Sequence, residues 1–353
     1  MSVGPITLIL NGRAAADERL REAVGSLRNA GFQVDVRACW EDGDPARHAR
    51  EVARRLAAME GVEAEAARNS VLVAAGGDGT INEVAAALVE CGQDCSAGPG
   101  GVEVGGPILA VVPYGTANDF ATAAGLPVDD PPRCLLQIPD LSSHRADVGR
   151  LNGRPFFNAA SAGYAARVTT EADPTVKKLL GGMAYWWTGL KNLADTAGTE
   201  VTVTADDDRW HGRVLAVVVG NGRYAGGGIA VTPHARIDDG KLEVTIVPEV
   251  GISGYKHLYD DLVAVEEGRD PTVITVGRAE KVTIEADEPI QVNLDGEPLT
   301  DRTLKFDVLR NAIRVLLPAT SPLLSPPPVK DAGDESHDAD ESPADGSHGD
   351  GPG

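Results

Sequence analysis

The sequence predicts two domains of different class: an α/β domain, with a parallel sheet and helices on both faces, followed by an antiparallel β-sandwich. Up to about residue 135, short apolar runs alternate with helical patterns, an order typical of parallel sheets. After about residue 140 the pattern changes to many short alternating strands, as in a sandwich. A length of 353 residues is enough for two hydrophobic cores.

In the first domain, taken as residues 1–135, short runs bounded by turn residues predict four strands, at 6–10, 32–36, 71–75 and 108–112. A helix between the first two strands ends at Gly31, and its apolar face carries Leu20, Ala23, Val24 and Leu27. Asp44-Pro45 opens a second helix that runs to about Met59. The glycine-rich segment 92–106 is expected to be a loop.

The second domain, taken as residues 136–309, is expected to hold most of the remaining strands and two helices, near 174–195 and 252–266. Alternating patterns predict strands at 155–160, 199–205, 210–219, 241–247, 271–276, 280–286, 290–294, 303–308 and 312–317. Residues 319–353 consist mostly of Pro, Asp, Ser, Ala and Gly, and we expect an acidic, disordered tail there.

The net charge of −21 argues against a nucleic-acid partner and against broad adhesion to anionic membranes, so any membrane contact should be local and transient. No apolar run approaches the roughly 20 residues that span a bilayer. The N-terminus enters a strand without a basic segment, so we expect no secretion signal and a cytoplasmic location. Cys91 and Cys95 are interpreted as free thiols in a reducing compartment, with a zinc site as the alternative.

The run Gly76-Gly77-Asp78-Gly79-Thr80 follows a buried strand and opens a helix. Glycines let the backbone approach a ligand, and the first N–H groups of a helix suit phosphate. Asp78 would repel bare phosphate, so a divalent cation or a hydrogen-bond network is expected between them. The alternative is a tight turn in which Asp78 caps the helix. The segment is not a Walker P-loop, because it has no GxxxxGK[ST] pattern.

Four further turns carry polar residues. Gly115-Thr116-Ala117-Asn118-Asp119-Phe120 is a second strand–turn–helix, in which Asn118 or Asp119 is a candidate cap. The glycine-rich segment 220–228 indicates close approach to a ligand or another domain, or a flexible hairpin loop. Asp238-Asp239-Gly240 and Asn293–Pro298 are each either a hairpin turn or a site, the first for a hard cation and the second for proton transfer through Glu297.

Together, in this order, the five motifs resemble those of bacterial diacylglycerol-kinase-type lipid kinases, and the likeness is greatest to the YegS group. The resemblance covers about residues 5–318. It implies a two-domain kinase with nucleotide in the interdomain cleft, and a last segment near 310–318 that returns to the first domain. The implied activity is transfer of the γ-phosphate of ATP to a hydroxyl of a lipid such as diacylglycerol or phosphatidylglycerol, with transient contact at the inner membrane surface.

The resemblance also implies residue roles. Glu297 would accept the proton and Asp78 would act beside it in catalysis, placing the cation or its waters. Mg²⁺, or Ca²⁺, would bind the Asp239 carboxylate and the main-chain carbonyls of Arg236 and Lys241. Cys39 stands where the family often has a nucleotide-contacting Thr, and a thiol is a weak hydrogen-bond partner. The remaining nucleotide contacts would be Gly77, Asp78, Gly79, Thr80, Ile81, Asn82, Glu83 and Thr116.

Two other functions fit parts of the pattern. NAD kinases and sugar-phosphate kinases have related glycine–Asp–glycine turns, but neither is expected to combine the turn at 116–120 with the turn at 294–297. A nucleotide-sensing module without turnover is the third interpretation. The aromatic segment Met183–Leu190 is expected either to pack on the sandwich or to line an acyl-chain groove.

Overall fold

The computed structural model describes residues 3–59, 67–96, 106–163, 198–251, 254–266 and 269–326. Its first half is an α/β unit whose four parallel strands lie in the order β2-β1-β3-β4. Their bounds are β1 Ile6–Leu10, β2 Val34–Ala38, β3 Val71–Gly76 and β4 Ile108–Pro113. Strands β3 and β4 are buried along their whole length, as expected for strands covered on both faces. The predicted α/β domain is confirmed.

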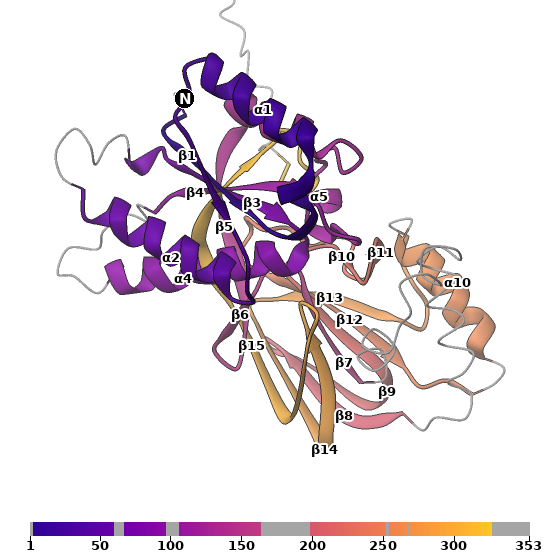
Figure 1. The fold of residues 1–353 in the computed structure, drawn as a ribbon. Helices are drawn as coiled ribbons and strands as arrows, with labels where there is room; N and C mark the ends of the chain where they lie inside the picture. The colour runs from indigo at the N-terminus through magenta and orange to yellow at the C-terminus, as the bar shows by residue number, and fades with distance from the viewer. Residues whose placement is uncertain are drawn as a thin grey trace, which may run out of the picture.

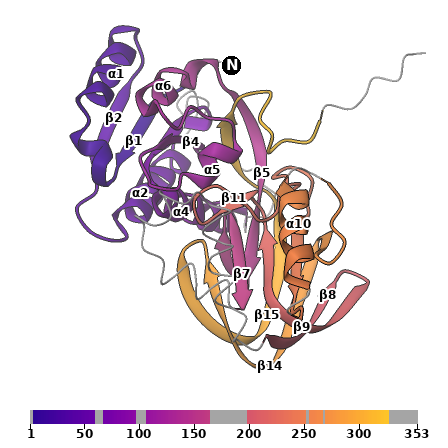
Figure 2. The ribbon, with the colours of Figure 1, turned by 90° about the vertical axis from the view of Figure 1, so that its right-hand side faces the viewer.

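The helices pack on this sheet in pairs, α1 with α6 and α2 with α4 (Figure 2). Their bounds are α1 Glu18–Asn29, α2 Asp44–Ala57, α4 Asp78–Ser96, α5 Asp119–Ala123 and α6 Pro131–Leu136. Asp17 caps α1 by accepting a hydrogen bond from the Arg19 N–H. The face of α1 that the sequence predicts as apolar is the buried one.

The second half is antiparallel and belongs to the same thirteen-stranded sheet. Its strands are β5 Ser142–Leu151, β6 Arg154–Phe156, β7 Ala159–Gly163, β8 Thr199–Ala205, β9 Asp208–Gly220, β12 Leu242–Pro248, β13 Thr275–Ala279, β14 Lys281–Leu294 and β15 Glu297–Leu317. A small hairpin, β10 Tyr224–Ala225 with β11 Ile229–Ala230, lies off this sheet. Helix α10, Tyr255–Glu266, covers one face of β9 and β12. The predicted sandwich-like second domain is confirmed.

Several predicted strands are corrected. The pair 303–308 and 312–317 forms one strand, β15, and the pair 280–286 and 290–294 forms one strand, β14. Each strand carries a register shift, and the shift in β15 includes Asn311, which has a φ of 53°. Such an irregularity interrupts the alternation of apolar residues as a turn does. The strand expected at 155–160 is split between β6 and β7, and the one expected at 271–276 begins at Thr275. The helix expected at 174–195 lies outside the described residues.

Strand β15 passes through both halves of the molecule (Figure 1). It pairs with β14 and β5 and then lies parallel to β4, where Val315 faces Leu109. The sheet is therefore continuous from β2 to β13.

The residues just after Pro318 differ from the expected disordered tail. Leu323 is fully buried in the core of the first half, and its carbonyl accepts a hydrogen bond from the Ile237 N–H at 3.0 Å. The Ser325 hydroxyl donates to Asp238 at 2.7 Å. The expectation is wrong for residues 319–326, because two apolar residues, Leu323 and Leu324, suffice to dock a short segment on an existing core.

The described part of the chain has no helix long and apolar enough to cross a membrane. Cys39, Cys91 and Cys134 form no disulfide there.

Candidate active site

The two glycine turns of the first half touch each other. A Cβ added at Gly115 would lie 2.6 Å from the Cα of Gly77, so neither position has room for a side chain. At Gly76 an added Cβ would collide with the Thr80 side chain. The ends of β3 and β4 therefore meet at one site lined by backbone, as the positions of the two motifs predict. The two turns, residues 76–80 and 115–118, are called the glycine corner below.

Asp78 ties this corner to helix α5. Its carboxylate oxygens accept hydrogen bonds from the N–H groups of Asp119 at 3.1 Å and Phe120 at 3.2 Å. Asn118, a predicted cap, instead has a φ of 53° and closes the turn by accepting from the Gly115 N–H at 2.8 Å. The side chain that caps α5 thus comes from a residue about forty positions earlier, which no local sequence pattern reveals.

The first turn of α4 presents its backbone and two of its polar side chains at the same edge. The Thr80 hydroxyl accepts a hydrogen bond from the Asn11 amide at 2.8 Å, which fixes the turn against the end of β1. Ile81 is fully buried, so only its main chain is available to a ligand. The side-chain amide of Asn82 is buried in the first turn of this helix, with Glu83 beside it. Gly79 and Thr116 lie in the two turns, and Thr116 is exposed.

Cys39 and Glu83 lie near one another. Burial, together with the nearby carboxylates of Asp44 and Glu83, raises the pKa of the Cys39 thiol to about 11. Burial also raises the pKa of Glu83; the Ala46 N–H lowers it, and the carboxylates of Asp42 and Glu297 raise it. The end of β2, the start of α4 and the turn that carries Glu297 therefore share one electrostatic neighbourhood.

The turn between β14 and β15 is locked to the second half through Asp295. Its carboxylate accepts hydrogen bonds from the N–H groups of Phe157 at 2.6 Å, Asn158 at 3.0 Å and Ala159 at 3.0 Å. Burial raises the pKa of Asp295 to about 7; the three N–H donors lower it, and the Asp78 carboxylate raises it. Two residues beyond, Glu297 is exposed and accepts a hydrogen bond from Arg154 at 3.2 Å.

A short chain of contacts links the two halves at this point. Asp78 accepts from the Phe120 N–H, the Phe120 ring packs on the Phe157 ring with centroids 4.5 Å apart, and the Phe157 N–H donates to Asp295. Asp78 and Asp295, from opposite halves, are thereby held in one site. The residues predicted from the first two motifs and from the last motif are brought together.

The glycine-rich segment 220–228 also joins the halves. The Asp119 carboxylate accepts hydrogen bonds from the N–H groups of Gly227 at 3.1 Å and Gly228 at 2.6 Å. Residues 226–228 all have positive φ, which glycine adopts without strain. Of the interpretations offered by the sequence, close approach to another domain is the one that the contacts show.

The predicted metal ligands lie in a separate loop between β11 and β12. The Asp239 carboxylate contacts the guanidinium of Arg278 and accepts a hydrogen bond from the Lys241 N–H at 3.0 Å. Oxygen ligands of this kind suit a hard cation. With an arginine on the carboxylate, however, the set Arg236, Asp239 and Lys241 does not fit a bound divalent cation as it stands.

The described residues hold no group of three or more His, Cys, Asp or Glu side chains that could bind a metal. At the main site, Asp78 and Asp295 are two carboxylates from opposite halves, and each accepts hydrogen bonds from main-chain N–H groups. Mg²⁺ is usually held by one or two carboxylates together with phosphate oxygens of a substrate and water. These residues therefore fit a cation that arrives with a nucleotide, and not one that the protein alone retains.

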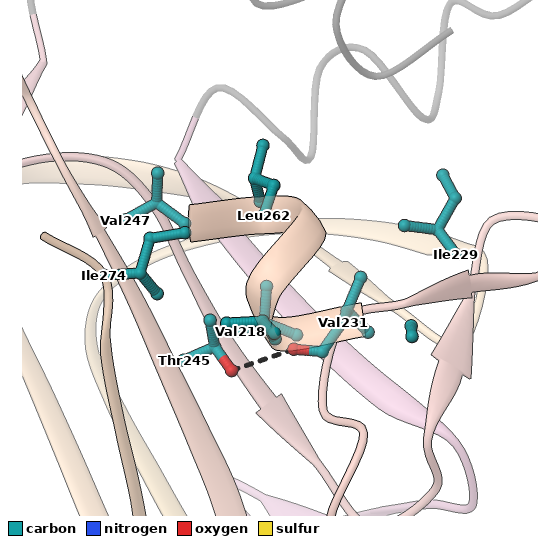
Figure 3. Close-up of a pocket in the computed structure, with 9 residues that line it drawn as sticks. Val218, Ile229, Val231, Thr245, Val247, Leu262 and Ile274 are labelled. Atoms are coloured by element: carbon teal, nitrogen blue, oxygen red, sulfur yellow. Dashed lines mark hydrogen bonds between the residues drawn. The ribbon is translucent and has the colours of Figure 1, made fainter. Parts of the chain in front are cut away.

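An apolar pocket lies between α10 and the sheet (Figure 3). Its cavity volume is small, about 20 Å³, and the rest of the pocket is open to solvent. Its wall comes from β9, β11, β12, α10 and the residue before β13: Val218, Ile229, Ala230, Val231, Thr245, Val247, Leu262, Val265 and Ile274. The Thr245 hydroxyl donates to the Val231 carbonyl at 2.8 Å, so it presents no free polar group (Figure 3).

Sequence reasoning missed this pocket. The only available signal is the unbroken apolar run Val214–Val219 in β9, which requires cover on both faces of an antiparallel strand. The segment Met183–Leu190, where an acyl-chain groove was expected, lies outside the described residues.

Comparison with known proteins identifies the family. Residues 5–151 match the diacylglycerol kinase catalytic domain, and residues 158–317 match the YegS C-terminal NAD kinase beta sandwich-like domain. The chain is 40% identical over 335 residues to a probable lipid kinase YegS-like protein of Pseudomonas aeruginosa, covering 94% of this chain and all of the relative. A relative with the same description from Stenotrophomonas maltophilia is 38% identical over 321 residues, which cover 90% of this chain and 97% of the relative.

Solved structures share the fold. A crystal structure from Bacillus anthracis superposes with a TM-score of 0.72 at 24% identity, covering 91% of this chain and 97% of that one. A second, described as a diacylglycerol kinase, superposes with a TM-score of 0.66 at 21% identity, covering 91% and 99%. With both family domains present in order and relatives at about 40% identity, the chain belongs to the YegS-like lipid kinases of the diacylglycerol kinase family.

Proposed function

We propose that this lipid kinase transfers the γ-phosphate of ATP to a hydroxyl group of a membrane lipid such as diacylglycerol or phosphatidylglycerol. The observation that carries the proposal is the contact chain Asp78–Phe120–Phe157–Asp295, which sets a carboxylate turn of the second half against the glycine corner of the first. Phosphoryl transfer depends mainly on positioning and charge neutralisation. This arrangement would supply the positioning, and a cation bound with the nucleotide would supply the neutralisation.

The phosphates would lie on the backbone N–H groups of Gly77, Gly79 and Thr80, where a glycine corner and a helix N-terminus admit close approach. Ile81, through its main chain, and Asn82 and Glu83 would complete this side. Cys39 would line the nucleotide at the end of β2, and Thr116 would offer its hydroxyl from the second turn. A divalent cation bound with the nucleotide would neutralise phosphate charge beside Asp78.

In the transfer, the lipid hydroxyl oxygen bonds to the γ-phosphorus in line with the breaking bond to ADP. The hydroxyl proton passes to the Glu297 carboxylate as the new bond forms. Glu297 is exposed to an incoming substrate, whereas Asp295 is held by three N–H donors. Asp295 therefore positions the turn, and Arg154 steadies the Glu297 carboxylate.

The apolar lining of this pocket would contact part of an acyl chain of the acceptor. Its wall at Ile229–Val231 directly follows Gly227 and Gly228, the residues that Asp119 holds at the site. An acyl chain in the pocket would leave its headgroup close to that loop. Because such a lipid resides in a bilayer, the enzyme would work by transient contact with the inner membrane surface from the cytoplasm.

The test is transfer of label from γ-labelled ATP to vesicles that contain diacylglycerol or phosphatidylglycerol, with NAD as an alternative acceptor. We expect labelled lipid and no labelled NAD. Glu297→Gln should lower kcat by about 10²–10⁴-fold, the usual contribution of a general base, with little change in the KM for ATP. Glu288→Gln is the matched control, since Glu288 is an exposed glutamate on the neighbouring strand β14. Full turnover by Glu297→Gln would refute its role, and labelled NAD would refute the lipid acceptor.

A further inference from the structure

The Asp239 carboxylate has a positively charged partner within the chain. Arg278, on strand β13, places its guanidinium on one carboxylate oxygen, and the Lys241 N–H donates to the other at 3.0 Å. Both side chains are partly shielded, with Asp239 18% exposed and Arg278 33% exposed. Each oxygen of this carboxylate is thus engaged by the protein itself.

The rest of the loop is satisfied in the same way. The Gly240 N–H donates to the buried Asp147 carboxylate at 2.6 Å, and Asp238 accepts from the N–H of Ser325 at 2.9 Å and from its hydroxyl at 2.7 Å. Arg310 packs against Gly240, where an added Cβ would lie 2.6 Å from its Nε. The loop therefore holds its shape through contacts that involve no ion.

We propose that Arg278 is the permanent counter-ion of Asp239 and takes the position that a divalent cation would otherwise occupy. A guanidinium and Mg²⁺ need the same carboxylate oxygens, and a cation beside Arg278 would meet like-charge repulsion in a partly shielded site. Because the arginine is part of the chain, its local concentration does not depend on the medium. Loop 236–241 is then stable without metal, and any cation required for catalysis acts only with the nucleotide.

The test measures cation binding and melting temperature in the absence of nucleotide. Mn²⁺ binding is followed by the loss of its free electron paramagnetic resonance signal, and melting is followed with excess Mg²⁺ or with EDTA. Wild-type protein should show no Mn²⁺ site that Asp239→Asn removes, and its melting temperature should be the same in Mg²⁺ and EDTA. Arg278→Met should create an Mn²⁺ site at least about tenfold tighter than any in wild type, and Mg²⁺ should raise its melting temperature.

Two controls separate a specific pair from a general change in charge. Arg310→Met removes a neighbouring guanidinium that does not touch Asp239, and it should create no site. Arg278→Lys keeps a positive charge and should behave as wild type. The double variant Arg278→Met/Asp239→Asn should lose the new site.

The proposal is overturned if wild-type protein binds Mn²⁺ at a site that Asp239→Asn abolishes, a measurement that does not depend on whether Arg278→Met folds. It is equally overturned if Arg278→Met gains no site, or if Arg310→Met gains the same one. None of these readouts uses kinase activity, so they stand apart from the test of phosphoryl transfer.

Discussion

Glu243 is fully buried in an otherwise apolar part of strand β12. It alternates with Leu242 and Val244, which face the sandwich core, and so lies on the same face as Thr245. Burial raises the pKa of Glu243 from 4.5 to about 7, and the His234 N–H and the charge of Arg223 lower it only in part. The folded protein therefore holds this carboxyl protonated at pH values where an unfolded chain would ionise it.

This residue makes stability depend on pH. As pH rises from about 4.5 to about 7, the unfolded state loses the proton first, so the free energy of unfolding falls and the loss is complete above 7. Glu243→Gln should remove that loss and raise the free energy of unfolding by roughly 1–3 kcal/mol near pH 8, with little change below pH 4.5. Urea unfolding of the wild-type protein and of Glu243→Gln across this pH range measures the difference in free energy of unfolding. Parallel pH profiles for the two proteins would contradict the assignment.

The carboxylates of the site show how far single residues can be interpreted from sequence. The motifs identify Asp78 as a site residue because it follows a strand and lies in a glycine turn, and they place Asp295 only in the turn that carries Glu297. Their partners are not identifiable in this way, since Asp78 binds N–H groups of residues 119 and 120, and Asp295 binds those of residues 157–159. Such contacts depend on the tertiary fold and correspond to no recognisable spacing of residues in the sequence.

At the level of elements, helix α5 and the glycine segment 220–228 form one of the contacts between the two halves at the site. The Asp119 carboxylate is almost fully buried and bridges from α5 to the N–H groups of Gly227 and Gly228. Three consecutive positive φ values leave this segment little order of its own. The hydrogen bonds to Asp119 therefore fix the position of this segment relative to the glycine corner. They also fix the position of the pocket wall that follows the segment.

Asp119→Ala should release this segment. The substitution removes the acceptor of the Gly227 and Gly228 N–H groups, so we expect faster hydrogen exchange at these two residues. We also expect a raised KM for the lipid. Stability should fall by about 1–3 kcal/mol. Asp129→Ala, at an exposed carboxylate of the same half, is the matched control and should change none of these. Unchanged exchange at Gly227 and Gly228 in Asp119→Ala would show that the segment is held by other contacts.

The bulged strands mark the limit of prediction at this scale. Alternation located the residues of β14 and β15, but each strand was divided in two, because a bulge interrupts the period in the same way that a turn does. Strands β3 and β4 gave no such difficulty, since their apolar runs are short and each is followed by a glycine turn. The residue pattern was enough to predict that a strand is present. Whether two predicted strands are one continuous strand depended on pairing with segments far along the chain.

At the level of the whole molecule, the two halves share more than a linker. Strand β15 runs from the active-site turn to β4, and Phe157 and Ile237 of the second half are buried in the core of the first. The segment 319–326 then returns across both, with Leu323 in that core and Ser325 on Asp238. We therefore expect the halves to unfold together.

This segment gives the prediction that tests the whole-molecule view. A chain that ends at residue 326 should melt as the full chain does, because composition predicts no packing for the acidic residues beyond. A chain that ends at residue 318 loses the burial of Leu323 and the bond to Ile237, and should be less stable by about 2–5 kcal/mol, as should Leu323→Ala. Calorimetry should show a single transition for each protein, shifted downward only in the last two. If the chain ending at 318 kept the melting temperature of the full chain, or if the halves melted in two steps, segment 319–326 would not be what couples the unfolding of the two halves.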